Sequence, residues 1–172
     1  MNALDRPRAE EVFNYFQSYI AKAPGQDLLA ALQETGQRAV AVLEAVPQQR
    51  EDHCYAEGKW SIKEVFQHLI DTERIFCHRA LSFAREDGHA LPGFDENAYV
   101  PSAEVGRRTL AGIGEELVAV RSSTILLFRS FSPAMLLRMG TANDKRMSVR
   151  ALGWTIAGHA IHHLDVIEQR YN

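Results

Sequence analysis

Apolar residues recur every three or four positions along most of the chain, which is the spacing that lines one face of an α-helix. The pattern predicts a short N-terminal helix within residues 1–24 and longer helices at about 27–46, 61–85, 102–131 and 148–171. Pro24, Pro47 and Pro133 follow three of the predicted helix ends, where proline is common because it cannot continue a helix. The chain therefore consists almost wholly of amphipathic helices.

Four long helices with a narrow apolar stripe are typical of a helix bundle. No stretch of alternating apolar and polar residues is long enough to indicate a β-strand, and residues 138–148 are expected to be irregular. We therefore expect an all-α protein, a single four-helix-bundle domain over residues 1–172 with an additional short N-terminal helix.

Residues 86–102 are rich in Gly, Pro and Asp and predict a long crossover loop between the second and third bundle helices. Loops of this length are often functional. A plain surface crossover is the alternative, because one is required wherever two neighbouring helices run parallel.

The composition mainly excludes several classes of protein. With 46% hydrophobic and 24% charged residues the chain is an ordinary globular protein, and a net charge of −3 favours neither nucleic acid nor a membrane surface as a partner. The two cysteines form no CxxC motif, no apolar run is long enough to span a membrane, and the N-terminus is too polar for a secretory signal. A cytoplasmic location is the expectation.

Candidate chemistry lies near the C-terminus, in the sequence AGHAIHHLDVIEQRY. On a helical wheel His163 falls inside the apolar arc of the last helix and His159 at its edge, whereas His162 lies roughly 140° away on the polar side. An inward HxxxH pair can bind a transition metal through two imidazoles. The alternative is that each is a core histidine hydrogen-bonded to a backbone carbonyl. Ala160 stands where a zincin would have its catalytic glutamate, which excludes that class of protease.

A third ligand should come from a helix that faces the same core. His68 lies just outside the edge of the buried arc of the helix at about 61–85, much as His159 does on its own helix. Bundles build metal sites from facing helices in this way, although a single histidine at such a position is more often a surface residue.

Glu73 falls near the middle of the same buried arc, where an unpaired carboxylate is costly. It could orient a histidine, act as a catalytic base, or form a structural ion pair with an arginine such as Arg121.

Four segments together carry a family resemblance: YAEGKWSIKEVFQHLIDTERIFCHRAL (55–81), LPGFDENAYV (91–100), VRSSTILLFRSF (120–131) and SVRALGWTIAGHAIHHLDVIEQRY (148–171). In this order they resemble the DinB-like (DinB/YfiT) superfamily of metal-binding four-helix-bundle proteins. That superfamily includes metal-dependent hydrolases and bacterial thiol S-transferases. The resemblance implies that His68, His159 and His163 hold the metal and that His162 does not.

The resemblance further implies a metal-dependent enzyme that acts on a small molecule. Zinc or nickel is the expected metal, with iron or manganese as alternatives, and three imidazoles leave coordination positions open for catalysis. We expect a small-thiol S-transferase in detoxification or stress response, with a low-molecular-weight thiol as cosubstrate. A hydrolase of small amides or esters is the first alternative, and a metal- or ligand-binding stress protein without activity is the second.

Residues 91–100 are expected to close over the metal, with Asp95, Asn97 and Tyr99 as polar contacts and Trp60 as an apolar wall. A substrate carboxylate could bind Arg74 or Arg79, although an arginine on a helix flank is usually only solvated. The aromatic N-terminal stretch VFNYFQSYI (12–20) suggests a homodimer, or packing of that helix on its own bundle.

Overall fold

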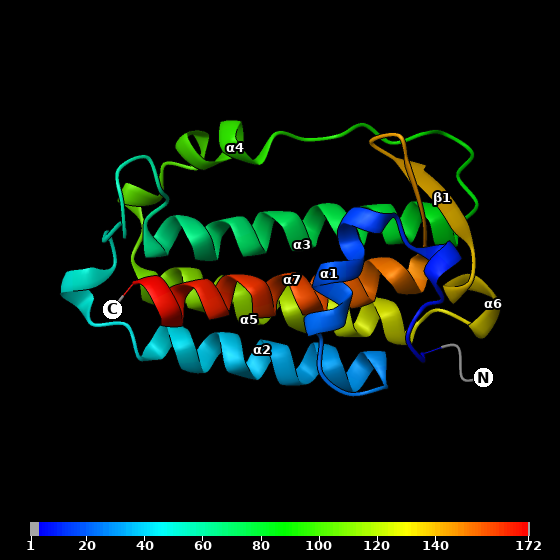
Figure 1. Ribbon diagram of the computed structural model, residues 1–172, viewed down its shortest axis with the longest axis horizontal. Helices are drawn as coiled ribbons and strands as arrows, with labels where there is room; N and C mark the ends of the chain where they lie inside the picture. The colour runs from blue at the N-terminus through cyan, green and yellow to red at the C-terminus, as the bar shows by residue number, and fades with distance from the viewer. Residues whose placement is uncertain (1–3, 172) are drawn as a thin grey trace.

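In the computed structural model, which describes residues 4–171, four long helices lie side by side along a common axis (Figure 1). They are α2 (Leu28–Glu44), α3 (Ile62–Ala84), α5 (Leu110–Arg129) and α7 (Val149–Arg170). The predicted all-α four-helix bundle is therefore confirmed. Residues 1–3 of the expected N-terminal helical segment, and Asn172, lie outside the described residues. No helix of the described chain is long and apolar enough to cross a membrane.

Each bundle helix begins at a side-chain cap, which satisfies a backbone N–H group that the first turn of a helix leaves unpaired. The capping residues are Asp27, Ser61, Thr109 and Ser148, and each accepts a hydrogen bond from the N–H three residues further on. At α3 the carboxylate of Glu64 also accepts from the Ser61 N–H at 2.6 Å. This reciprocal capping box fixes the start of α3, and Ser61 lies seven residues before His68, the first candidate ligand.

Within the bundle, α7 packs against α2 and α3, and α5 packs against the same two helices from the other side. The chain runs in one direction along α3 and α5 and in the opposite direction along α2 and α7 (Figure 1). Since α3 and α5 are parallel neighbours, the connection between them must return along the length of the bundle. The predicted crossover is confirmed.

The crossover is more regular than expected, and the predicted helix at 102–131 is too long. Residues 96–102 form α4 (Glu96–Ser102) and residues 105–107 form the short 3-10 helix η3 (Val105–Arg107), so that α5 begins only at Leu110. Between α4 and η3, Glu104 adopts a left-handed conformation with φ of 47°, which interrupts the helix. At the other end α5 stops at Arg129 and is followed by α6 (Pro133–Leu136).

The expectation that the chain has no β-strand is wrong. The strands β1 (Met139–Ala142) and β2 (Lys145–Ser148) form an antiparallel hairpin just before α7. Asn143 and Asp144 connect them with φ of 51° and 56°, which is the left-handed pair of a type I′ turn. Strands of four residues are too short to give a detectable alternation. The hairpin also binds the crossover, because the Leu91 N–H donates to Thr141 O at 3.0 Å.

The N-terminal segment contains less helix than predicted, and it lies across the bundle. It contains η1 (Ala9–Glu11) and α1 (Asn14–Lys22), and a further 3-10 helix, η2 (Gln48–Arg50), follows α2. Helix α1 packs on α7 (Figure 1). The approach is so close at Gly158 that a Cβ atom there would lie 1.8 Å from the carbonyl oxygen of Tyr19.

The apolar core is divided into two clusters along the bundle axis. One cluster lies toward the hairpin end and includes Phe76, Phe128 and Leu152. The other lies toward the opposite end and includes Phe66 and Leu164. Polar side chains occupy the layer between the clusters, namely Thr35, His68, Thr72, Glu73, Arg121, Thr124, Thr155 and His159.

Candidate metal centre

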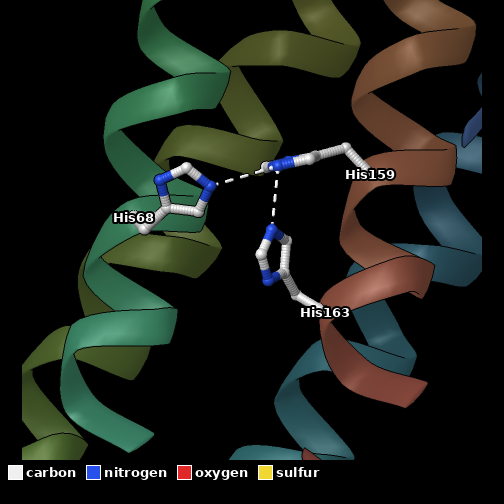
Figure 2. Close-up of side chains that lie close together, drawn as sticks. All are labelled: His68, His159 and His163. Carbon is white, nitrogen blue, oxygen red and sulfur yellow. Dashed lines mark hydrogen bonds between the residues drawn. The ribbon is translucent and has the colours of Figure 1, made fainter. Parts of the chain in front are cut away.

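Three histidines from two facing helices converge on one point in this polar layer (Figure 2). His68 extends from α3, and His159 and His163 extend from successive turns of α7. The Nε2 atom of His159 lies 3.1 Å from His68 Nε2 and 3.0 Å from His163 Nε2. The structure therefore brings together the three residues that the sequence selected as ligands.

The arrangement of these nitrogens fits a metal ion better than it fits hydrogen bonding among the rings. The Nε2 atom of a neutral imidazole carries either one proton or one lone pair, so His159 Nε2 cannot form good hydrogen bonds to both neighbours at once. Tetrahedral zinc with ordinary Zn–N distances would hold pairs of ligand nitrogens about 3.3 Å apart, which is close to the two separations from His159, and the three ligand atoms all lie within 4.8 Å of one another. One cation would engage all three lone pairs.

Burial keeps the three imidazoles neutral, which is the state that binds metals. It lowers the pKa of His68 to about 4. It also lowers the pKa of His163 to about 3, with a smaller contribution from the neighbouring histidines. The pKa of His159 is well below its usual value for the same reasons.

Neighbouring groups fix the orientation of the rings. The Nδ1 atom of His68 faces Thr72 Oγ1 at 3.4 Å on the next turn, so that with Nδ1 protonated the Nε2 lone pair points to the cluster. Trp60 packs beside the cluster, with its ring 4.8 Å from His68 and stacked 6.4 Å from His163 between centroids. The Tyr171 hydroxyl donates to Trp60 O at 2.6 Å and holds this segment in place.

A cavity of about 270 Å³ opens from the histidine cluster. Its walls come from α1, α3, α7, the crossover and the hairpin, and they are largely aromatic. The lining residues are Tyr15, Phe16, Tyr19, Trp60, His68, Thr72, Phe76, Arg79, Phe94, Glu96, Asn143, Lys145, His159 and His163. A small molecule in this space would contact the cluster directly.

Glu73 does not approach the histidines. Its two carboxylate oxygens accept hydrogen bonds from Nε and Nη2 of Arg121, each at 2.8 Å. Arg121 in turn donates from Nη1 to Leu32 O and Thr35 Oγ1. The geometry thus corresponds to the structural ion pair, and it gives no support to a role for Glu73 as a base or as the partner of a histidine.

The expected substrate contacts are distributed unevenly. Trp60 lies at the cluster. Asp95 caps α4 by accepting from Asn97 N at 2.9 Å and is exposed, and it does not line the cavity. Asn97 and Tyr99 line separate depressions that reach His163 and His68 from other sides. Arg74 is exposed and pairs with Glu116 on α5, because its position on α3 faces away from α7.

Several cavity residues were not selected from the sequence. Phe94 comes from the crossover, Asn143 and Lys145 from the hairpin, and Tyr19 from α1, all remote from the histidines along the chain. The dipeptide Asn143-Asp144 between two short polar-apolar stretches was a usable hairpin signal. His162, which was expected on the polar side, lies outside the cluster and is half-buried against Tyr19, with ring centroids 5.2 Å apart.

The fold and the cluster together define a four-helix-bundle protein with a candidate three-histidine metal site. Residues 8–167 match the family model of the DinB superfamily, and the chain belongs to this superfamily. Among solved structures it is similar to YfiT from Bacillus subtilis, with a TM-score of 0.73 and 18% sequence identity over 98% of this chain and 95% of that one. YfiT is described as a probable metal-dependent hydrolase with an unusual four-helix bundle topology. A search of curated proteins gives no match.

Proposed function

We propose that this protein is a metal-dependent hydrolase of small amide or ester substrates. The observation that carries the proposal is the convergence of three neutral imidazoles at one end of an open cavity. The description of YfiT as a probable metal-dependent hydrolase supports it. Zinc or nickel suits this nitrogen donor set, with iron and manganese as alternatives.

A metal bound by three imidazoles supplies Lewis-acid chemistry and lowers the pKa of a coordinated water toward neutrality. The side chains around the histidines would orient the ligands and enclose the substrate. Thr72 orients His68, while Trp60, Phe76 and Phe94 form apolar walls that keep bulk water away from a bound substrate. Glu96 is the carboxylate among the lining residues, and it comes from the crossover helix α4.

The first test is the metal content of protein purified without a histidine tag. We expect about one equivalent in the parent and its loss in His68→Ala and in His163→Ala, with the helical content retained. His162→Ala is the matched control, because this neighbouring histidine lies outside the cluster, and it should keep the metal. A parent that remains empty after reconstitution with zinc, nickel, iron and manganese would contradict the proposal.

The second test assigns the reaction. The metal-loaded parent should hydrolyse members of a panel of small amides and esters without an added thiol, and His163→Ala should not. Turnover of electrophiles that requires a low-molecular-weight thiol would identify the S-transferase expected from the sequence instead. A stoichiometric metal without turnover in either screen would favour the non-enzymatic alternative.

A further inference from the structure

Among the described residues, six side chains of Lys, Arg or Glu are buried. Five of them form an ion pair with a residue of opposite charge, and one does not. Arg121 pairs with Glu73, Arg150 pairs with Glu11, and buried Lys63 pairs with Asp52 at 2.7 Å. Arg79 is only 6% exposed and has no ion pair with any residue that the structure describes. A buried cation without a counter-charge is costly, so this arginine requires an explanation.

Arg79 lies in the wall of the cavity that contains the histidines. Its Nη2 donates to Pro92 O at 3.1 Å, and its guanidinium carbon lies 5.6 Å from the ring centroid of Phe76 and 5.9 Å from that of Phe94. No buried side-chain nitrogen among the described residues lacks a hydrogen-bond partner. None of the remaining N–H groups of Arg79 is therefore both buried and unpaired, and the side chain itself lines the cavity.

Charge in the rest of the cavity is consistent with an anionic ligand. Lys145 from β2 also lines it and forms no ion pair with the described residues, and Glu96 contributes one negative charge. Two cations and one carboxylate leave one positive charge apart from any metal. A monoanion balances this charge, and the planar guanidinium fork of Arg79 matches the geometry of a carboxylate.

The position of Arg79 also limits the shape of the ligand. His68, Thr72, Phe76 and Arg79 lie at steps of four, four and three on one side of α3 and line the same cavity. The backbones of His68 and Arg79 are about 16 Å apart along the axis at 1.5 Å per residue, and the tilt of Arg79 toward the N-terminus of α3 shortens this span. Aromatic side chains line the space between the two ends.

We propose that Arg79, assisted by Lys145, binds the carboxylate of an elongated small molecule whose apolar or aromatic middle lies along Phe76 and Phe94 and whose other end reaches the three histidines. This inference rests on the proposed function, because it takes the cavity to be the substrate site. It assigns the substrate class as carboxylate-bearing and gives Arg79 the role of a substrate-binding residue.

Binding of 4-phenylbutyrate and of its uncharged analogue 4-phenylbutyramide to the metal-free full-length protein at pH 7.5 tests the proposal. Calorimetry should show that the parent binds the carboxylate at least about tenfold more tightly than the amide, as expected for a charge-assisted hydrogen bond. The Arg79 Nε–H signal in ¹⁵N NMR spectra should shift with the carboxylate only. Equal or undetectable binding of the two probes would overturn the proposal.

Substitutions of Arg79 test whether this residue causes the preference for the carboxylate. Arg79→Gln should lose the preference for the carboxylate while it retains the weaker binding of the amide, which reports an intact cavity. Arg79→Lys keeps the charge and should retain part of the preference if the glutamine variant does not fold. Arg74→Gln, on an exposed arginine of the same helix, should behave as the parent. A full preference in Arg79→Gln would overturn the proposal.

The use of metal-free protein separates this inference from the proposed function. Carboxylate binding that depends on Arg79 in a protein that never takes up metal would overturn only the hydrolase. Metal-dependent hydrolysis that Arg79→Gln leaves unchanged for substrates with and without a carboxylate would overturn only the carboxylate site.

Discussion

Glu73 and Arg121 form an ion pair buried inside the bundle, with side-chain exposures of 3% and 7%. The same arginine also donates to Leu32 and Thr35 of α2, so that it joins three helices. Gly36 provides the room, since a Cβ there would lie 2.8 Å from Arg121 Cγ. The pair therefore fixes the packing around the site without contacting the reacting groups.

Glu73→Gln tests this structural role. The substitution leaves the Arg121 cation buried without its counter-charge, and we expect the free energy of unfolding to fall by about 3 kcal/mol or more. Urea denaturation measures this, and Arg74→Gln in the exposed pair with Glu116 should change it by no more than about 1 kcal/mol. The metal content of Glu73→Gln should equal that of the parent. A stable, metal-loaded variant that has lost turnover would instead indicate a catalytic base.

At the scale of elements, the cavity depends on how closely α1 lies against α7. Helix α1 supplies Phe16 and Tyr19 to the cavity wall, and Gly158 of α7 allows its backbone to approach. The ring of Tyr19 contacts His159 edge to face at 5.4 Å between centroids. A change in the spacing of these two helices should therefore affect both stability and the shape of the site.

Gly158→Ala is the corresponding test. In a helix interior alanine is normally favoured over glycine by about 1 kcal/mol. Here the added Cβ would lie 1.8 Å from the Tyr19 carbonyl oxygen, and we expect a net loss of about 1–3 kcal/mol in the free energy of unfolding. Thermal and urea unfolding measure the change.

The matched control is Gly106→Ala. A Cβ at Gly106 meets nothing within 4 Å, and the change should be within about 0.5 kcal/mol. If Gly158→Ala were as stable as the parent, α1 would not be held against α7 as closely as described.

At the scale of the whole molecule, a second buried ion pair ties the N-terminal segment to the start of α7. The carboxylate of Glu11 in η1 accepts from Arg150 and, at 2.9 Å, from Ser148 Oγ. Burial raises the pKa of Glu11, but hydrogen bonds from Arg150, Arg8 and Ser148 outweigh it and lower the pKa from 4.5 to about 2. The folded state therefore favours the ionised carboxylate more strongly than the unfolded chain does.

This shift predicts a contribution to acid sensitivity. Because the pKa is lower in the folded state, the stabilisation by Glu11 is fully present above pH 4.5 and is lost as the pH falls toward 2. Urea unfolding of Glu11→Gln and the parent between pH 7 and pH 3 should give a difference that narrows below pH 4.5. Glu10→Gln, on an exposed neighbour, should show no such narrowing. A difference for Glu11→Gln that is independent of pH would contradict the assignment.

The homodimer expected from residues 12–20 remains a prediction. Part of that stretch is used within the bundle, since Val12 and Ile20 are buried and Phe16 lines the cavity. Phe13 and Tyr15 remain exposed by 40% and 56%.

The sequence by itself determined the features that depend on local spacing. The steps of three and four predicted the bundle helices, Ser61 marked the start of α3, and the HxxxH spacing placed His159 and His163 on one face. These properties follow from the geometry of a single helix, which is the same in any fold. Short elements show no such periodicity, and α4, the hairpin and the true start of α5 were missed, although Asn143-Asp144 offered a turn signal for the hairpin.

Only the tertiary structure decided which side chains from different elements meet. The spacing along α3 places Arg79 on the same side as His68 and Arg74 on a different side, but the elements packed there decide that Arg74 pairs with Glu116 and that Arg79 is buried in the cavity wall. By sequence alone Glu73 could have accepted a hydrogen bond from a histidine. The position of α5 instead brings Arg121 within hydrogen-bond distance of its carboxylate. The physical reason is that the distance between side chains on different elements depends on how the helices pack and cross and on where the crossover and the hairpin lie. The periodicity of residues along one helix does not specify these arrangements.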